Sequence, residues 1–146
     1  MINITRLSAQ DDLNKVVFDI QKANWVQASE ISSEDYTVEN LSLYLKNTES
    51  VFVVAYSNEN FAGMASANLL NKPNGDTWLY VDEVDVCEDR QRQGIGTALI
   101  SYLLKFAMDS DIPEVFQVHL GTRDYGSNKT GRVLPFVKFC EEMGLV

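Results

Sequence analysis

The stretch Val86-Cys87-Glu88-Asp89-Arg90-Gln91-Arg92-Gln93-Gly94-Ile95-Gly96 decides how this chain folds. An apolar, acid-containing run (78–86) leads into it, and a helix-forming run (97–100) follows it. The order predicts a strand, a basic glycine-containing turn and the start of a helix. The first turn of a helix leaves backbone N–H groups unpaired, and its dipole favours negative charge. The stretch therefore predicts a phosphate-binding loop.

The spacing of the glycines indicates which class of phosphate-binding loop this is. Gly94 and Gly96 let the backbone approach an anion, and Arg90 and Arg92 supply charge-assisted donors beside it. The spacing is neither Gly-x-x-x-x-Gly-Lys-Ser/Thr nor Gly-x-Gly-x-x-Gly, so it fits neither a P-loop nor a dinucleotide fold. Downstream, Gly121 and Gly126 have the P-loop offset, but Ser127-Asn128 follows where Lys-Ser/Thr is required.

The segment Gln91-x-x-Gly94-x-Gly96 resembles the Arg/Gln-x-x-Gly-x-Gly/Ala signature of the GNAT superfamily of N-acetyltransferases. That family places its fourth strand before this signature and its third helix after it. An ordinary glycine-containing helix start is the alternative. The resemblance implies acetyl-coenzyme A as co-substrate, with the pyrophosphate held by a loop and the pantetheine arm paired to the preceding strand. The matching loop residues are Arg92, Gln93, Gly94, Ile95, Gly96 and Thr97, and the matching strand residues are Val84, Asp85 and Val86.

Length and composition are typical of a small enzyme. The 146 residues, 45% of them hydrophobic, predict a single domain over 1–146. No apolar run approaches the roughly 20 residues needed to cross a bilayer, and no secretory segment opens the chain, so we expect no membrane partner. The two cysteines, Cys87 and Cys140, have neither a disulfide pattern nor a metal-ligand spacing. We therefore expect a cytoplasmic protein without a bound metal.

The charge balance points to the class of partner. Acidic residues outnumber basic ones 21 to 12, which gives a net charge of −9 and argues against a nucleic-acid partner. Most such charge is a solvated surface. The more specific interpretation is an acidic cleft that attracts a cationic amine.

Hydrophobic periodicity and turn residues predict the order β-α-α-β-β-β-α-β-α. Ser8 is expected to cap the first helix and Thr37 to begin the second. The resemblance covers nearly the whole chain and implies an α/β fold of the α+β type, with a mixed, mostly antiparallel, twisted sheet and about four helices. The expected strands are 2–7, 51–56, 61–70, 78–86 and 115–120, and the last two helices are 98–108 and 133–143.

Three acids on one strand, Asp82, Glu83 and Asp85, are the candidates for a general base. Acyl transfer to an amine requires one, because a protonated amine cannot attack. Strand alternation sends Glu83 and Asp85 to one face and Asp82 to the other, unless a bulge intervenes. The alternative is that the acids line a solvated face, but their mutual repulsion makes that placement unfavourable. Because family enzymes carry a carboxylate at the positions of Asp82 and Glu83, we expect Glu83 to be the base, then Asp82.

The sequence departs from the family pattern at the residue expected to donate a proton to the leaving thiolate. Family members carry Leu-Tyr-x-x-x-Gly-Phe late in the chain, and here Cys140 takes the tyrosine's place in Phe139-Cys140-Glu141-Glu142-Met143-Gly144-Leu145. Cys140 is either the donor or a buried core residue, and a cysteine acetyl-enzyme is a further alternative. Tyr125 is a substitute donor. We expect His119 to be structural rather than catalytic.

The resemblance also bears on assembly and substrate. Family domains carry further strands after the Gly-Phe position, so an open sheet edge predicts a homodimer. The segments 80–86 and 92–100 look most like the aminoglycoside 3-N-acetyltransferases, which implies an aminoglycoside or other polyamine acceptor. Protein N-terminal or lysine acetylation, on a peptide amine, is the alternative reaction. A non-catalytic module that binds coenzyme A, within a regulatory or toxin–antitoxin assembly, is the alternative of a different class.

Overall fold

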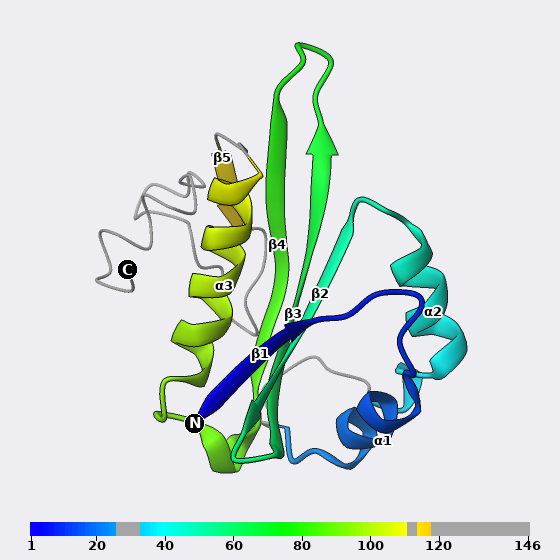
Figure 1. Cartoon of the computed structure of the whole chain (residues 1–146), viewed down its shortest axis with the longest axis vertical. Coiled ribbons are helices and arrows are strands. Elements are labelled where there is room, and N and C mark those ends of the chain that lie inside the picture. Colours follow the sequence, from blue (N-terminus) through cyan, green and yellow to red (C-terminus); the bar gives the residue numbers. More distant parts are fainter. Residues whose placement is uncertain (26–32, 111–113, 118–146) are drawn as a thin grey trace.

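The computed structural model describes residues 1–25, 33–110 and 114–117 of the chain. They form a five-stranded sheet with helices on both faces (Figure 1). The strands are β1 (Ile2–Arg6), β2 (Ser50–Ser57), β3 (Asn60–Asn71), β4 (Thr77–Val86) and β5 (Glu114–Gln117). The helices are α1 (Asn14–Lys22), α2 (Val38–Lys46) and α3 (Ile95–Asp109), with single 3-10 turns η1 (Ser33–Asp35) and η2 (Glu88–Arg90).

The strands lie in the order β1-β2-β3-β4-β5. The first four are antiparallel to their neighbours, and β5 is parallel to β4. The predicted fold class and the order of elements through the fifth strand are therefore confirmed. The helix predicted over 133–143 lies outside the described residues. In the part of the chain that the structure describes, no helix is long and apolar enough to cross a membrane.

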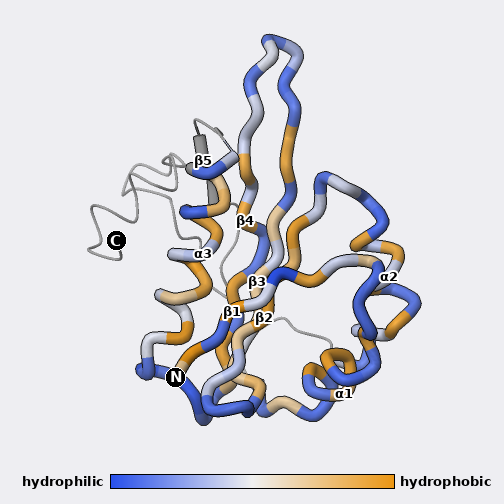
Figure 2. The backbone as a smooth tube through the Cα atoms, in the orientation of Figure 1, coloured by the Kyte–Doolittle hydropathy of each residue, from blue (hydrophilic) through white to orange (hydrophobic). Residues whose placement is uncertain are grey.

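Two hydrophobic clusters cover the two faces of the sheet, as the alternation of strand side chains requires. One packs Val51, Val53 and Leu79 against Leu99 and Leu103 of α3. The other packs strand residues against α1 and α2; its buried members are Leu13, Val16, Val17, Ile20, Leu41, Phe52, Val54 and Met64. Because β2 is covered on both faces, its sequence is a continuous apolar run rather than an alternating one (Figure 2).

The starts of the first two helices differ in how well the sequence predicts them. Thr37 is the N-cap of α2, and its side chain accepts a hydrogen bond from the Asn40 N–H at 3.1 Å. The prediction for Ser8 is wrong, because α1 begins only at Asn14. The Ser8 N–H donates to Asp11 Oδ2 at 2.7 Å and the Asp11 N–H to Ser8 O at 3.1 Å, so this pair closes a separate turn before the helix.

We expect Gly63→Ala to lower the free energy of unfolding by about 2 kcal/mol, because β3 and β4 approach closely at this residue. A Cβ on Gly63 would lie 2.6 Å from the backbone O of Asp85, which cannot move without breaking the strand pair. Urea unfolding measures the change. Gly96→Ala is the control, since a Cβ on Gly96 would make only an ordinary contact, 3.6 Å from Val86 Cγ2. An unchanged urea midpoint for Gly63→Ala would contradict the close approach.

Candidate functional site

A bulge in β4 determines which acids face the same way. Ser66 pairs with Glu83 and the next residue, Ala67, pairs with Val81, so Asp82 is an extra residue on β4. On either side of the bulge, Val81 and Val84 pack toward α3. The bulge therefore interrupts the alternation that would send Asp82 and Glu83 to opposite faces of the sheet, and the two side chains lie on the same face. Both acids line one pocket on the face covered by α1 and α2.

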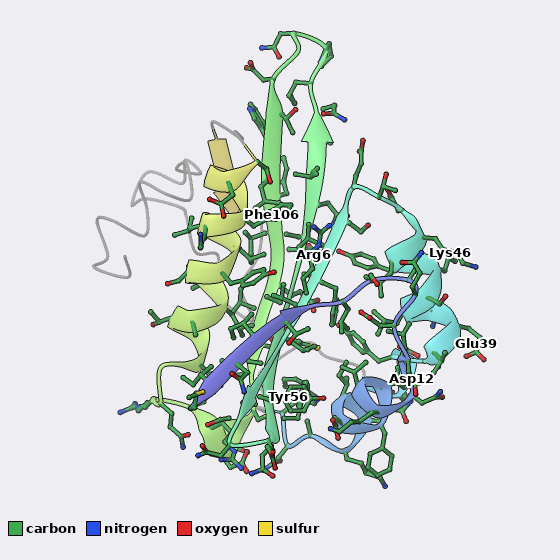
Figure 3. The ribbon with its side chains drawn as sticks, in the orientation of Figure 1. Arg6, Asp12, Glu39, Lys46, Tyr56 and Phe106 are labelled. Atoms are coloured by element: carbon green, nitrogen blue, oxygen red, sulfur yellow. The ribbon has the colours of Figure 1, made fainter. Side chains whose placement is uncertain are left out.

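This pocket, which we call the acid–aromatic pocket, has a volume of about 240 Å³. It lies between the β4 bulge, α2 and the segment that precedes α2. Its lining combines carboxylates with aromatic rings: Asp35, Tyr36, Asn40, Leu41, Tyr44, Phe52, Ser66, Asp82 and Glu83. The charged residues on the outer side of α2, Glu39 and Lys46, point away from the sheet and are exposed (Figure 3). Such a lining suits a ligand with a cationic group, which the carboxylates attract and the aromatic faces contact.

Two polar side chains of the pocket lining, Tyr36 and Glu83, are joined by a hydrogen bond, and Asp85 lies next to Glu83 on β4. The Tyr36 hydroxyl donates to Glu83 Oε2 at 3.3 Å. Asp85 follows Glu83 by two residues on the same strand, so strand alternation places the two carboxyl groups side by side on one face. Asp85 is only 6% exposed, and within the described residues its Oδ2 is buried without a hydrogen-bond partner.

The surroundings change the protonation of these groups. Burial and then the charge of Glu83 raise the pKa of Asp85 from 3.8 to about 7. Burial raises the pKa of Tyr44 to about 12, and burial followed by the charges of Glu83 and Asp85 raises the pKa of Tyr36 still further. Both tyrosines therefore keep their hydroxyl protons at neutral pH. No group of three metal-ligating side chains occurs within 1–25, 33–110 and 114–117.

The predicted phosphate-binding loop has a left-handed backbone at two residues. The φ angles of Arg92 and Gly94 are +62° and +85°. The helix α3 begins at Ile95, and the Ala98 N–H donates to Gly94 O at 2.9 Å. The N–H groups of the first helical turn, from Ile95 to Thr97, precede that first helical hydrogen bond and have no acceptor within the helix. The Ile95 side chain is buried against the sheet, so this residue combines a core side chain with an available N–H.

A second set of backbone groups lies on the edge of β4 beyond the bulge. The Cys87 N–H donates to Ala62 O at 2.9 Å, so Cys87 directs its main-chain groups toward β3. Because these directions alternate along a strand, Val84 and Val86 direct theirs away from β3. On that side, the described part of β5 pairs with β4 only from Trp78 to Val81. The register between the described part of β5 and β4 therefore covers β4 only up to the bulge.

The structure brings together residues that the sequence alone does not. The bulge puts Asp82 and Glu83 in one pocket. Cys140, Tyr125 and His119 lie outside the described residues. Sequence reasoning missed Tyr36 as a partner of Glu83, since the two are 47 residues apart and Tyr36 ends an irregular polar stretch. The sequence did indicate that Tyr36 directly precedes α2, because Thr37 is the N-cap of that helix.

Comparison with known proteins gives a family and a set of similar folds. The model of the acetyltransferase (GNAT) family matches residues 15–128. An aminoglycoside acetyltransferase, HMB0005, from an uncultured soil metagenomic sample superimposes with a TM-score of 0.64 at 18% identity, over 80% of this chain and 78% of its own. A ribosomal-protein-alanine N-acetyltransferase from Brucella melitensis biovar Abortus 2308 gives 0.57 at 18% identity, over 80% and 79%. A predicted acetyltransferase with acetyl-CoA from Clostridium acetobutylicum gives 0.60 at 15% identity, over 99% and 89%.

No curated protein sequence matches the chain significantly. At these identities the similar structures bear on the fold alone. The predicted resemblance is confirmed, and aminoglycoside acetyltransferases are among the similar structures.

Proposed function

This chain belongs to the acetyltransferase (GNAT) family, and from that premise we propose that it moves the acetyl group of acetyl-coenzyme A to the amine of a cationic acceptor in the acid–aromatic pocket. The observation that carries the proposal is the β4 bulge. It puts the Glu83 carboxylate in the pocket, directly before the segment of β4 from Val84 to Val86. The base for the amine thus adjoins the strand segment to which we assign the thioester arm.

The coenzyme is assigned to the edge of β4 and the loop before α3. Val84 and Val86 offer outward N–H and C=O groups that suit the amide groups of a pantetheine arm. Asp85 directs its main-chain groups toward β3, so we assign this edge to the two valines. The N–H groups of Ile95, Gly96 and Thr97 suit the pyrophosphate, and the exposed side chains of Arg92 and Gln93 border the same loop. Gly94 supplies the positive φ that turns the chain into the helix.

The proposed reaction begins with a proton transfer. Glu83 removes one proton from the acceptor ammonium, and the nitrogen lone pair then attacks the thioester carbonyl carbon. Backbone N–H groups of β4 stabilise the oxyanion. The carbon–sulfur bond breaks, the leaving sulfur gains a proton, and the amide nitrogen has lost its second proton. Cys140 and Tyr125 remain the predicted donors to that sulfur.

The pocket supports a cationic acceptor that enters through one amine-bearing arm. Asp35, Asp82 and Glu83 provide negative charge, while Tyr36 and Phe52 provide aromatic faces. The volume of about 240 Å³ is below the roughly 300–1,000 Å³ of pockets that enclose whole ligands. An aminoglycoside or a polyamine meets this description. A peptide amine is the alternative acceptor, since a lysine side chain has the same form. The homodimer and the cytoplasmic location remain predictions from the sequence.

We expect Gly94→Trp to weaken acetyl-coenzyme A binding at least tenfold, because a bulky side chain would hold the loop amides away from the pyrophosphate. Isothermal titration of the coenzyme into the purified protein measures the change. Gly75→Trp is the matched control, since it places the same side chain on another glycine with positive φ in the β3–β4 turn. Normal coenzyme affinity in Gly94→Trp would show that the pyrophosphate binds elsewhere.

Acceptors are compared in the same preparation by following the release of the free thiol of coenzyme A. Aminoglycosides, linear polyamines and peptides with a free amino terminus or a lysine make up the panel. Transfer to any of these amines excludes the non-catalytic module. A protein that binds no coenzyme at all would overturn the proposed function, because the loop would then be purely architectural.

A further inference from the structure

Asp85 is a buried acid to which the proposed reaction gives no role. Its side chain is 6% exposed, and it lies on the strand segment that borders both the pocket and the coenzyme edge. Burying a carboxylate is unfavourable unless a cation or several donors compensate its charge. Within residues 1–25, 33–110 and 114–117, no ion pair reaches Asp85 or Glu83. The residue therefore calls for a physical explanation other than a salt bridge.

We propose that the proton acceptor of the reaction is the pair of carboxyl groups of Glu83 and Asp85, so that the proton taken from the acceptor ammonium is held between them. We call these two groups the carboxyl pair. The inference rests on the proposed function, because it concerns the base of that reaction. Glu83 faces the substrate in the pocket, and Asp85, which acts only through Glu83, is a positioning residue.

The contacts of Glu83 support a shared proton. Its Oε2 accepts a hydrogen bond from Tyr36 at 3.3 Å, and the buried Asp85 lies two residues further on the same face of β4. Two carboxyl groups form a hydrogen bond only when one of them carries a proton. Asp85 is the more buried of the two, and its Oδ2 has no hydrogen-bond partner among the described residues, so below about pH 7 the proton of the pair resides on Asp85.

The charged and titratable groups around the pair keep this arrangement close to neutral pH. Those facing it from the described elements are Tyr36 before α2, Tyr44 on α2 and Asp82 at the bulge. Both tyrosines are neutral at this pH, and Asp82 adds negative charge. With burial and the neighbouring Glu83 charge raising the pKa of Asp85 to about 7, the pair loses its proton near pH 7. A base is most effective when it titrates near the operating pH.

The proton balance of a turnover follows from this arrangement. Above pH 7 the pair carries no proton, and it takes one from the ammonium through Glu83. The amine attacks, the carbon–sulfur bond breaks, and the second nitrogen proton reaches the leaving sulfur. The pair then releases its proton to solvent when the products leave. Each turnover releases one proton overall, which matches an ammonium and a thioester giving an amide and a thiol.

The test is the pH dependence of kcat/KM in Asp85→Asn, with an acceptor whose amine ionises above pH 9 so that its own titration stays separate. In the wild-type protein we expect the acidic limb near pH 7. In Asp85→Asn we expect the acidic fall of the kcat/KM profile to lie at least one pH unit lower than in wild type. We expect kcat at pH 8 to be about tenfold lower and the Kd of the coenzyme to be unchanged. The asparagine keeps the size of the side chain and a donor for Glu83, but it carries no proton to share.

Tyr36→Phe is the matched control, because it removes the hydrogen bond from Tyr36 to Glu83 without removing a carboxyl group. We expect it to lower kcat and leave the acidic limb in place. An unchanged limb in Asp85→Asn, in an active preparation, would overturn the shared proton and leave the proposed function standing. A wild-type protein that transfers no acetyl group to any acceptor would instead overturn the proposed function. Infrared difference spectra between pH 6 and pH 8 provide an independent readout. In the wild-type protein we expect the band of a protonated carboxyl group at pH 6 to disappear at pH 8. The same change of this band in Asp85→Asn would overturn the carboxyl pair.

Discussion

Glu83→Gln is expected to lower kcat for acetyl transfer by roughly 10²- to 10³-fold, which is the usual contribution of a general base. Glutamine has the size of glutamate, and its carbonyl oxygen can still accept the hydrogen bond from Tyr36. The amide cannot remove a proton from the acceptor ammonium. The Kd of acetyl-coenzyme A is expected to stay the same, because the coenzyme is assigned to backbone groups of Val84, Val86 and the loop before α3.

Asp82→Asn is the matched control for this substitution. Asp82 is exposed at the bulge and lines the same pocket, so it adds charge to the pocket without a described contact to Asp85 or Tyr36. We expect Asp82→Asn to raise KM for a cationic acceptor by a few fold, with kcat nearly unchanged. Steady-state kinetics at pH 8, with both substrates varied, separates the two effects. If Asp82→Asn abolished turnover while Glu83→Gln retained it, the base would be Asp82.

Much of the fold could be predicted because its signals are local. Glycines and turn residues separate the strands, β2 is one apolar run, and Thr37 carries a capping side chain where α2 begins. The start of α1 could not be predicted in the same way. Ser8 and Asp11 have the spacing of a helix cap, but their hydrogen bonds close an isolated turn instead. A side chain that competes for backbone N–H groups fits both outcomes, and only tertiary packing decides between them.

The candidate site was predictable only in part, for a geometric reason. The sequence places three acids on β4, but whether Asp82 and Glu83 share a face depends on one extra residue opposite Ser66 and Ala67. A bulge is a property of the register between two strands, so the sequence of β4 by itself leaves it open. The contact between Tyr36 and Glu83 likewise could not be predicted from the sequence of either segment alone. It forms because α2 and the segment before it cover this face of the sheet.

Asp85→Asn is expected to remove most of the decline in stability that the wild-type protein shows as the pH rises from 4 to 7. The pKa of Asp85 is 3.8 when unfolded and about 7 when folded. Between these values the folded chain binds a proton that the unfolded chain has lost, so the free energy of unfolding falls as the pH rises. Asp85 thus contributes stability that is fully present below pH 3.8 and is lost by about pH 7. The difference corresponds to roughly 4 kcal/mol.

Urea unfolding of both proteins at pH 4, 5, 6, 7 and 8 measures this effect. The free energy of unfolding of Asp85→Asn, relative to wild type, should rise steadily up to about pH 7 and then stay constant. Asp82→Asn is the control, because it makes the same change of side chain at an exposed acid on the same strand. A curve for Asp85→Asn parallel to that of wild type would mean that Asp85 titrates alike in the folded and unfolded chains. The burial of Asp85 beside Glu83 would then have to be compensated by charge from outside the described residues, and Asp85 could not hold a proton for Glu83.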